Sequence, residues 1–305
     1  MPLLAVNHHY FRQGGTGQGI YPTTPDALTA ETLQLRSRWR VGDENDILQH
    51  CNGNGGTEAV CILTFDDGLK EQMLTLPLLA KLNVTAMYFV PTAPLLRHEV
   101  LDVHKLHMIR SRLSDTELAA DLTQRFDFST YEFDEKLLSI QYRYDEPLSR
   151  KVKYFLNFVI DAAARIEWTS LRFTELFGSE RAACEALYMN ADDLRILSGR
   201  HLLGTHAHTH VPLATLPDVQ ARFEIEQSLD VLENLSGQRP LGISYPFGGK
   251  SAVSNSLFEI AQQAGLKYGF TMERGINTSD NMSPFSLKRI DTNDVDSWVD
   301  TQFVG

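Results

Sequence analysis

The chain has 305 residues, of which 43% are hydrophobic and 22% are charged, and its formal net charge at pH 7 is −11. This composition is that of an ordinary globular protein with room for one large α/β domain or two small ones. A chain this acidic lacks the basic face that binding to a nucleic-acid backbone requires, so we expect no nucleic-acid partner.

The cysteines and the N-terminal residues narrow the class of protein further. Cys51, Cys61 and Cys184 are odd in number and form no CxxC motif, which argues against a disulfide framework or a thiolate zinc site. The N-terminal sequence MPLLAVNHHYF has neither the basic region nor the long apolar run of a secretory signal. No stretch reaches the roughly 18 apolar residues of a membrane span. We therefore expect a cytoplasmic protein without a membrane span, and the sequence does not predict its oligomeric state.

Short apolar runs that end in polar or glycine clusters predict the strands of the core. Stretches with helical periodicity lie between them, so we expect an α/β protein with a mostly parallel sheet or a barrel. In such folds the functional site lies at the carboxyl ends of the strands. The predicted strands are Leu3–Val6, Val60–Phe65, Val84–Val90, Leu202–Gly204, Leu241–Tyr245 and Lys267–Thr271, and the predicted helices are Leu69–Leu82, kinked at Pro77, Pro217–Leu235 and Ser251–Ala264.

Residues from about 95 to 195 interrupt this alternation of strands and helices. The segments SDTELAADLTQRF and LSRKVKYFLNFVIDAAARIEW have charged helical patterns, with helix-start signals at Asp115 and Pro147. We predict a helical insertion between two core strands, which either packs without a functional role or caps a substrate groove. The glycines at 14, 15, 17 and 19 do not lead from a strand into a helix, so we expect no nucleotide cofactor.

Two adjacent carboxylates, Asp66 and Asp67, follow the predicted strand Val60–Phe65 directly, with Gly68 allowing the chain to turn. One interpretation is a turn with a helix cap, since aspartate is common there. The other is a charged site that needs a partner for both carboxylates. A divalent cation is such a partner, because without one the two like charges repel and one of the two pKa values rises.

Three histidines follow the predicted strand Leu202–Gly204 in the sequence GTHAHTH. His206 and His210 are four residues apart, so a helical turn would place both imidazoles on one side. Together with a carboxylate such as Asp67 they would form a three-ligand metal site with open positions. Asp66 could then stay off the metal and act as general base. A polar loop with incidental histidines is the alternative interpretation.

A third stretch, LGISYPFGGK, runs from the predicted strand Leu241–Tyr245 into a turn fixed by Pro246. The main-chain amides near Phe247 could serve as oxyanion donors, and the Phe247 ring could line a sugar-binding groove. We expect Tyr245 and Phe247 to lie on the substrate and oxyanion side of the site. A plain turn at the end of a strand is the alternative.

TFDDG, GTHAHTH and SYPFG, in this order, resemble the polysaccharide deacetylase family, also called NodB-homology proteins or carbohydrate esterase family 4. The resemblance covers residues 60–90 and 200–290, together with the N-terminal strand. It implies an irregular (β/α)7-type barrel, so we expect one catalytic domain over residues 1–305 with the helical insertion inside it. It also implies metal-dependent hydrolysis of acetyl groups on sugars.

The resemblance assigns roles to several residues by position. Asp66 matches the family's catalytic base, and Asp67, His206 and His210 match its metal ligands, with His208 at a variable position. Many members pair the base with an arginine in the third motif, where this chain has Ser244 instead. Arg289 resembles an arginine in a late motif of one branch and is our candidate replacement, with a surface charge as the alternative.

The general acid is expected on the N-terminal strand. Family members usually carry a histidine near the C-terminus, but no histidine follows His210 here. LAVNHHYF resembles the N-terminal strand that supplies this histidine in a circularly permuted branch acting on exopolysaccharides. His8 and His9 point to opposite sides of a strand, so at most one faces the site. We choose His9, with Asp291 or Asp294 as the residue that orients it.

The sequence thus predicts a hydrolase that removes an N-acetyl or O-acetyl group from a sugar or glycan precursor. We expect surface-polysaccharide biosynthesis, O-antigen or capsule, as its setting. The expected cofactor is a divalent metal, with zinc preferred over Co²⁺, Ni²⁺, Fe²⁺ and Mn²⁺. The alternatives are a cytoplasmic C–N hydrolase acting on a small non-sugar amide, and a non-catalytic glycan-binding protein.

Overall fold

The computed structural model describes residues 2–14, 20–54, 56–142, 145–278 and 283–301. The chain divides into two compact units. The first comprises residues 1–14, 22–99 and 184–305, and the second comprises residues 15–21 and 100–183. Of the described helices, none is long and apolar enough to cross a membrane. The single catalytic domain with an insertion over residues 95–195 stays a prediction, because two compact units do not by themselves define a domain.

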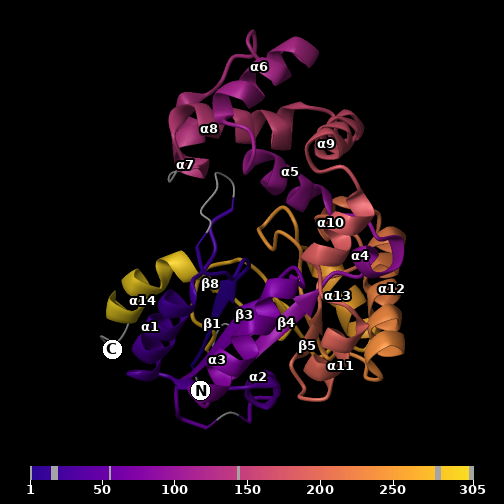
Figure 1. Cartoon of the computed structure of the whole chain (residues 1–305). Helices are drawn as coiled ribbons and strands as arrows, with labels where there is room; N and C mark the ends of the chain where they lie inside the picture. Colours follow the sequence, from indigo (N-terminus) through magenta and orange to yellow (C-terminus); the bar gives the residue numbers. More distant parts are fainter. Residues whose placement is uncertain (1, 15–19, 55, 143–144, 279–282, 302–305) are drawn as a thin grey trace. The chain divides into compact units, whose positions relative to one another are not determined.

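The first unit is built on a parallel sheet that curls into a half-barrel with helices around it (Figure 1). The described strands follow the order β7-β6-β5-β4-β3-β1-β8, and β2 pairs with β3 off this path. Their bounds are β1 (Leu3–His8), β2 (Arg40–Val41), β3 (Val60–Phe65), β4 (Ala86–Val90), β5 (Leu203–Thr205), β6 (Gly242–Ser244), β7 (Tyr268–Phe270) and β8 (Ile290–Asp291).

One short segment touches both ends of this sheet. Leu287 forms a parallel bridge with Phe270 of β7, and three residues later Ile290 pairs with Val6 of β1. Arg289, one of the two intervening residues, therefore lies directly before β8 in a segment that pairs with both β7 and β1. The α/β fold and its curled parallel sheet confirm the barrel-type architecture expected from the sequence.

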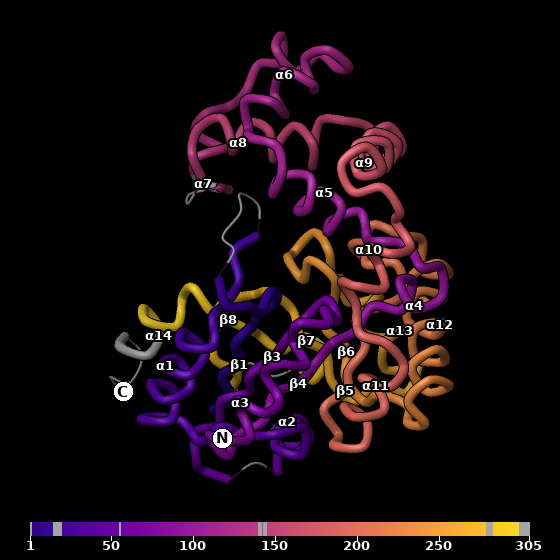
Figure 2. Tube along the Cα trace, viewed as in Figure 1, coloured from indigo at the N-terminus to yellow at the C-terminus, as the bar shows by residue number. Residues whose placement is uncertain are grey.

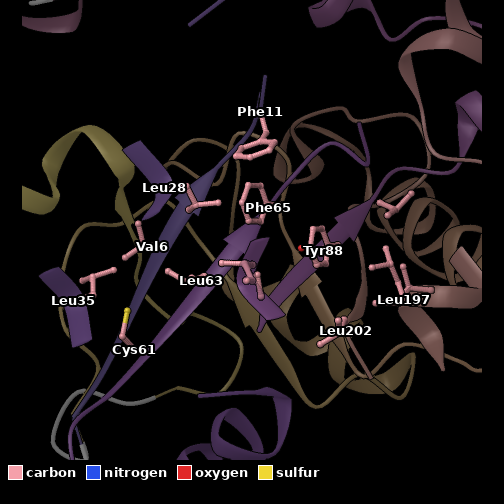
Figure 3. Close-up of a cluster of buried hydrophobic side chains, with 14 of the residues drawn as sticks. Val6, Phe11, Leu28, Leu35, Cys61, Leu63, Phe65, Tyr88, Leu197 and Leu202 are labelled. Atoms are coloured by element: carbon pink, nitrogen blue, oxygen red, sulfur yellow. The ribbon is translucent and has the colours of Figure 1, made fainter. Parts of the chain in front are cut away.

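Helices cover the outside of the curled sheet. On one side, Figure 3 shows Leu28 and Leu35 of α1 among the strand residues Val6 and Leu63, and these four side chains belong to one buried apolar cluster. Burying a leucine side chain stabilises a fold by about 1.5–3 kcal/mol. Figure 2 shows α12 and α13 together at the other end of the sheet, where they contact each other. The helical segments of this unit are α1 (Pro25–Arg36), α2 (Glu44–Cys51), η1 (Lys70–Leu74), α3 (Thr75–Lys81), α4 (Ala93–Arg97), α11 (Ala191–Ser198), η3 (Leu213–Thr215), α12 (Asp218–Ser236), α13 (Asn255–Gln263), η5 (Thr292–Asp294) and α14 (Val295–Thr301).

The second unit is helical in its described part and accounts for most of the segment between β4 and β5. Asp115 and Pro147 begin helices there, as the sequence predicts. A buried carboxylate, Asp121, helps hold this unit together by accepting hydrogen bonds from the Trp168 indole and the Arg172 guanidinium. Its helices are α5 (Asp102–Arg110), α6 (Asp115–Arg125), α7 (Glu135–Gln141), α8 (Pro147–Tyr154), η2 (Phe155–Val159) and α9 (Ala162–Phe177), and α10 (Glu180–Leu187) runs from this unit into the first.

Candidate metal centre and active site

The turn after β3 places two buried carboxylates in different surroundings. The strand ends at Phe65, and the next residue, Asp66, is 2% exposed. Asp67 is 5% exposed and adopts a left-handed backbone conformation with φ 79°, followed by Gly68 with φ 61°. A Cβ atom on Gly68 would lie 2.7 Å from Cγ1 of Val90, so only glycine fits there. The left-handed turn therefore sends the two neighbouring carboxylates in different directions.

The loop after β5 carries the predicted histidine ligands. Ala207 and His210 both have φ 59°, a conformation that costs free energy for residues other than glycine and is concentrated at functional sites. The buried His206 ring donates a hydrogen bond from Nδ1 to the Ser244 main-chain oxygen at 2.6 Å. Because a carbonyl can only accept, this bond leaves the His206 Nε2 lone pair available to a metal.

The two loops bring Asp67, His206 and His210 together. Asp67 Oδ1 lies 3.5 Å from His206 Nε2 and 3.2 Å from His210 Nε2. One possible ligand atom from each of the three residues lies within 4.8 Å of the others. One carboxylate and two imidazoles form a donor set suited to zinc and similar divalent cations. Burial lowers the pKa of His206, but the charges of Asp66 and Asp67 outweigh it and raise that pKa overall. The residues present fit a divalent cation.

A buried glutamate from α12 holds the histidine loop. Glu224 accepts hydrogen bonds from the main-chain amides of His208 at 3.2 Å and Thr209 at 2.7 Å, and from the Thr209 hydroxyl at 2.7 Å. The His208 ring points away from the other two histidines, because its Nδ1 lies 2.8 Å from the Thr92 hydroxyl. His208 is therefore part of the loop's support, which agrees with its exclusion from the predicted ligands.

Asp66 forms a buried ion pair with Arg289. The guanidinium donates to both carboxylate oxygens, at 3.0 and 2.8 Å, and the Ser244 hydroxyl donates to Asp66 Oδ2 at 3.0 Å. Burial alone would raise the pKa of Asp66. The Arg289 charge, then the His206 charge, the Arg289 hydrogen bonds and the His9 charge, together outweigh burial and hold the pKa of Asp66 below its usual range. Asp66 is thus ionised at neutral pH.

The alternative interpretation of Arg289 as a surface charge is wrong. Its side chain is fully buried, and the segment that carries it pairs with Phe270 of β7 through Leu287 and with Val6 of β1 through Ile290. The guanidinium also lies 5.6 Å from the centre of the Phe270 ring. An arginine from a distant strand therefore occupies the place beside Asp66, next to the Ser244 hydroxyl.

The side chains of the two N-terminal histidines lie in different surroundings, as expected for neighbouring residues of an extended chain. His8 is fully buried, with Nε2 2.8 Å from Glu31 and Nδ1 donating to the Thr64 main-chain oxygen at 3.1 Å. His9 lies just beyond β1, within electrostatic range of Asp66. Its Nε2 is 3.5 Å from the Asn7 side-chain nitrogen. Of the two histidines, His9 is the one on the side of the candidate base.

Both aspartates that we expected to orient His9 have contacts with other residues. The Asp291 carboxylate caps the following turn through the Asn293 amide at 2.9 Å, and its charge acts on His8. Asp294 forms an ion pair with Arg274 at 2.9 Å. The orientation of His9 by Asp291 or Asp294 therefore stays a prediction.

The structure places the two candidate residues of the third stretch, Phe247 and Tyr245, in different surroundings. Phe247 is 54% exposed, has φ 63°, and its ring centre lies 5.2 Å from that of His210, so it can line the site. The prediction for Tyr245 is wrong. Its ring is fully buried against Phe258, and its amide donates to the Phe270 oxygen at 3.0 Å within the sheet. Strand alternation turns this side chain into the core.

Comparisons with known proteins show what this chain is similar to. Residues 189–269, which include both histidine ligands and the SYPFG turn, match the family model described as polysaccharide deacetylase. Over this part of its length the chain is similar to polysaccharide deacetylases. This similarity indicates an enzyme of the deacetylase class, a hydrolase acting on the amide bonds of acetylated sugars. No curated protein matches the chain.

Three solved structures share the fold of this chain over nearly their whole length. IcaB from Ammonifex degensii has a TM-score of 0.59 and 13% identity, covering 98% of this chain and 97% of its own. The Streptococcus pyogenes deacetylase PplD, in complex with acetate, has a TM-score of 0.57 and 14% identity, covering 95% and 92%. The BpsB deacetylase domain from Bordetella bronchiseptica has a TM-score of 0.55 and 15% identity, covering 95% of each chain. At these identities the likeness shows the fold alone.

Several residues that shape the site were not singled out from the sequence. Asn7 accepts a hydrogen bond from Arg289 at 2.9 Å, Glu224 holds the histidine loop, and Gln72 contacts the main chain beside Asp66. Asn7 had a detectable signal, since it is a polar residue inside the apolar run LLAVN. Glu224 and Gln72 lie on helical segments, where a polar residue is ordinary and only the fold shows that it is buried.

Proposed function

We propose that this deacetylase hydrolyses the acetamide of an acetylated sugar with the help of a divalent cation, preferably zinc, held by Asp67, His206 and His210. The observation that carries the proposal is the position of the Asp66–Arg289 pair next to this cluster. A buried ionised carboxylate and a buried set of metal ligands on adjacent residues form the arrangement that metal-assisted hydrolysis requires.

A divalent cation in this cluster would lower the pKa of a water molecule and polarise the acetyl carbonyl. The remaining chemistry belongs to side chains. Asp66 is kept ionised by Arg289, so it can accept a proton from the attacking water. The same hydrogen bonds fix its orientation, which reduces the reorganisation needed during proton transfer.

His9 is our candidate for the general acid. It gives a proton to the sugar nitrogen as the C–N bond breaks, which yields acetate and a free amine. The main-chain amides around Phe247 and Gly248 are candidate donors to the oxyanion, and the exposed Phe247 ring would stack on a sugar. Arg289 acts through Asp66 and is a positioning residue.

We propose an acetylated precursor of a surface polysaccharide, such as O-antigen or capsule, as the substrate. The match to the polysaccharide deacetylase model supports a glycan over a small amide. The cytoplasmic location stays a prediction, which fractionation of cells expressing the tagged protein would test.

Acetate release from matched substrates tests the proposal. Zinc-loaded protein is incubated with N-acetylglucosamine oligomers, O-acetylated oligomers, and a panel of ureides and cyclic imides, beside Asp66→Asn and Asp67→Ala variants. We expect acetate from the N-acetylated glycan and a loss of at least about 100-fold in both variants. Turnover of the small amides alone would instead identify a non-sugar C–N hydrolase. Glycan binding without turnover, unchanged in metal-free protein, would identify a binding protein.

A further inference from the structure

The candidate acid His9 and the candidate base Asp66 follow two neighbouring strands of the sheet. Strands β1 and β3 pair in parallel from Leu3 and Val60 to His8 and Phe65, and the last connection is the Asp66 amide donating to the His8 oxygen at 3.0 Å. His9 and Asp66 are the first residues beyond the ends of the two strands. Their relative orientation therefore depends on whatever joins the two main chains beyond this last bond.

The Gln72 side chain makes such a connection. The Gln72 side-chain nitrogen donates to the main-chain oxygen of His9 at 2.8 Å and to that of Asp66 at 2.6 Å. A carboxamide nitrogen has two hydrogens, so these two bonds use both. Gln72 is fully buried in η1, the short helical segment that follows the TFDDG turn.

The orientation of the Gln72 amide is determined by its partners. Its nitrogen faces two carbonyl oxygens, and a flipped amide would place oxygen against oxygen at both contacts. Among the residues that the structure describes, the Gln72 Oε1 atom is buried and has no hydrogen-bond partner. An unpaired buried acceptor is unfavourable for folding. A requirement for the two donated bonds explains why a glutamine occupies this position.

The neighbouring residue fixes the same part of the chain. Glu71 accepts a hydrogen bond from the Phe11 amide at 2.8 Å and forms an ion pair with Arg12 at 2.8 Å. Two successive side chains of η1 therefore hold residues 9–12, the segment that carries the candidate acid. Gln72 differs from Glu71 because it also binds the residue that carries the candidate base.

We propose that Gln72 is a positioning residue that sets the orientation of His9 relative to Asp66 by binding both main chains at once. The proposal rests on the proposed function, because it assumes that His9 protonates the leaving group. Its contacts are with main-chain oxygens and involve neither the three candidate metal ligands nor the Arg289 guanidinium. Losing Gln72 should therefore impair leaving-group protonation while metal binding persists.

The test uses the zinc-loaded full chain with Gln72→Leu and two substrates. The nitrogen of an N-acetylglucosamine oligomer must be protonated to leave, whereas the aryloxide of 4-nitrophenyl acetate leaves without an acid. General acid catalysis contributes on the order of 10²–10⁴-fold, so we expect kcat for the amide to fall by roughly 10-fold or more. We expect kcat for the ester to stay within about twofold, with zinc stoichiometry unchanged. Equal losses on both substrates, or no loss on the amide, would overturn the proposal.

Two further variants separate the possible failures. Leu79→Ala loosens the adjacent helix α3, where Leu79 is 1% exposed, without touching either carbonyl, and it should leave the amide-to-ester ratio as in the wild type. His9→Ala should reproduce the selective loss on the amide. If His9→Ala keeps full amide activity, the acid role in the proposed function fails, whatever Gln72→Leu does.

A readout without turnover keeps the positioning role testable even if neither substrate reacts. Histidine side-chain NMR spectra of the zinc-loaded protein report each imidazole separately. Gln72→Leu should shift the His9 resonances and leave those of His206 and His210 in place. Unchanged His9 resonances would refute the positioning role, and absent turnover by the wild type would refute the proposed function alone.

Discussion

Replacing Arg289 with methionine should destabilise the protein strongly, because it leaves a buried carboxylate without its charged partner. The Arg289 side chain is 0% exposed and that of Asp66 is 3% exposed, and the guanidinium donates to both carboxylate oxygens. Removing one member of a buried ion pair costs about 3–5 kcal/mol. The Ser244 hydroxyl would remain as a hydrogen-bond donor, but it carries no charge.

Arg40→Met is a matched control at the surface. Arg40 pairs with Asp46 and Glu58, but its side chain is 42% exposed, and exposed pairs contribute less than about 1 kcal/mol. Urea unfolding with a chelator present keeps metal binding out of the comparison. Asp66→Asn and the double variant with Arg289→Met complete a cycle, in which the double variant should lose less stability than the sum of the single ones. If Arg289→Met loses no more stability than Arg40→Met, the buried pair does not have the role we assign to it.

Three further predictions follow from particular contacts. Burial lowers the pKa of His8, but the interaction with Glu31 outweighs burial and raises that pKa above 6.5. The His8–Glu31 pair therefore stabilises the fold fully below pH 6.5, and this stabilisation disappears as the pH rises through the folded-state pKa of His8. The Tm difference between wild type and His8→Gln should accordingly be largest in acid, and a pH-independent difference would contradict this. Glu224→Ala should weaken zinc affinity about 10–100-fold, as measured by calorimetry, whereas Glu224→Gln keeps an acceptor oxygen and should lose less affinity. Equal zinc affinities in the wild type and both variants would show that Glu224 does not support the histidine loop. Gly68→Ala should lower the free energy of unfolding by about 1–3 kcal/mol, because the added Cβ would lie 2.7 Å from the Val90 side chain. An unchanged midpoint of urea unfolding would show that the turn relaxes without cost.

The strands of the core were predictable because they are buried runs with sharp ends. Val60–Phe65 matches its strand at both ends, whereas Val84–Val90 was too long by the two residues before Ala86. The strand Leu3–Val6 was too short, because Asn7 and His8 are polar residues that continue the strand with buried side chains. A run of apolar residues therefore predicts a buried strand, but the predicted strand stops too early where a buried polar residue continues it.

Elements without a pattern of their own were not predictable. The strands β2 (Arg40–Val41) and β8 (Ile290–Asp291) have two residues each, too few to show an alternation. The position of β8 decides that Arg289 is buried, and its pairing with β1 is a contact between opposite ends of the chain. Such long-range pairing is set by the closing of the sheet and leaves no local signal.

Site residues that belong to a sequence motif were predictable. Site residues that act through contacts made only in the folded chain were not. Asp67, His206 and His210 were chosen from their spacing and from the family resemblance, and the structure brings their ligand atoms together. Gln72 and Glu224 act through main-chain atoms of other segments, which a single sequence does not reveal. Tyr245 was misplaced because the strand continues through its amide, and alternation then turns its ring into the core.

The most direct test of the account is the metal content of the protein. Protein purified without added metal, then titrated with zinc, is compared with Asp67→Ala and His210→Ala. His208→Gln is the matched control, because this histidine lies in the same loop and points toward Thr92. We predict about one zinc ion per chain in the wild type and in His208→Gln, and none in the other two variants. A wild type that takes up no zinc, nickel or cobalt, or an Asp67→Ala variant that binds zinc as tightly as the wild type, would contradict the metal centre proposed here.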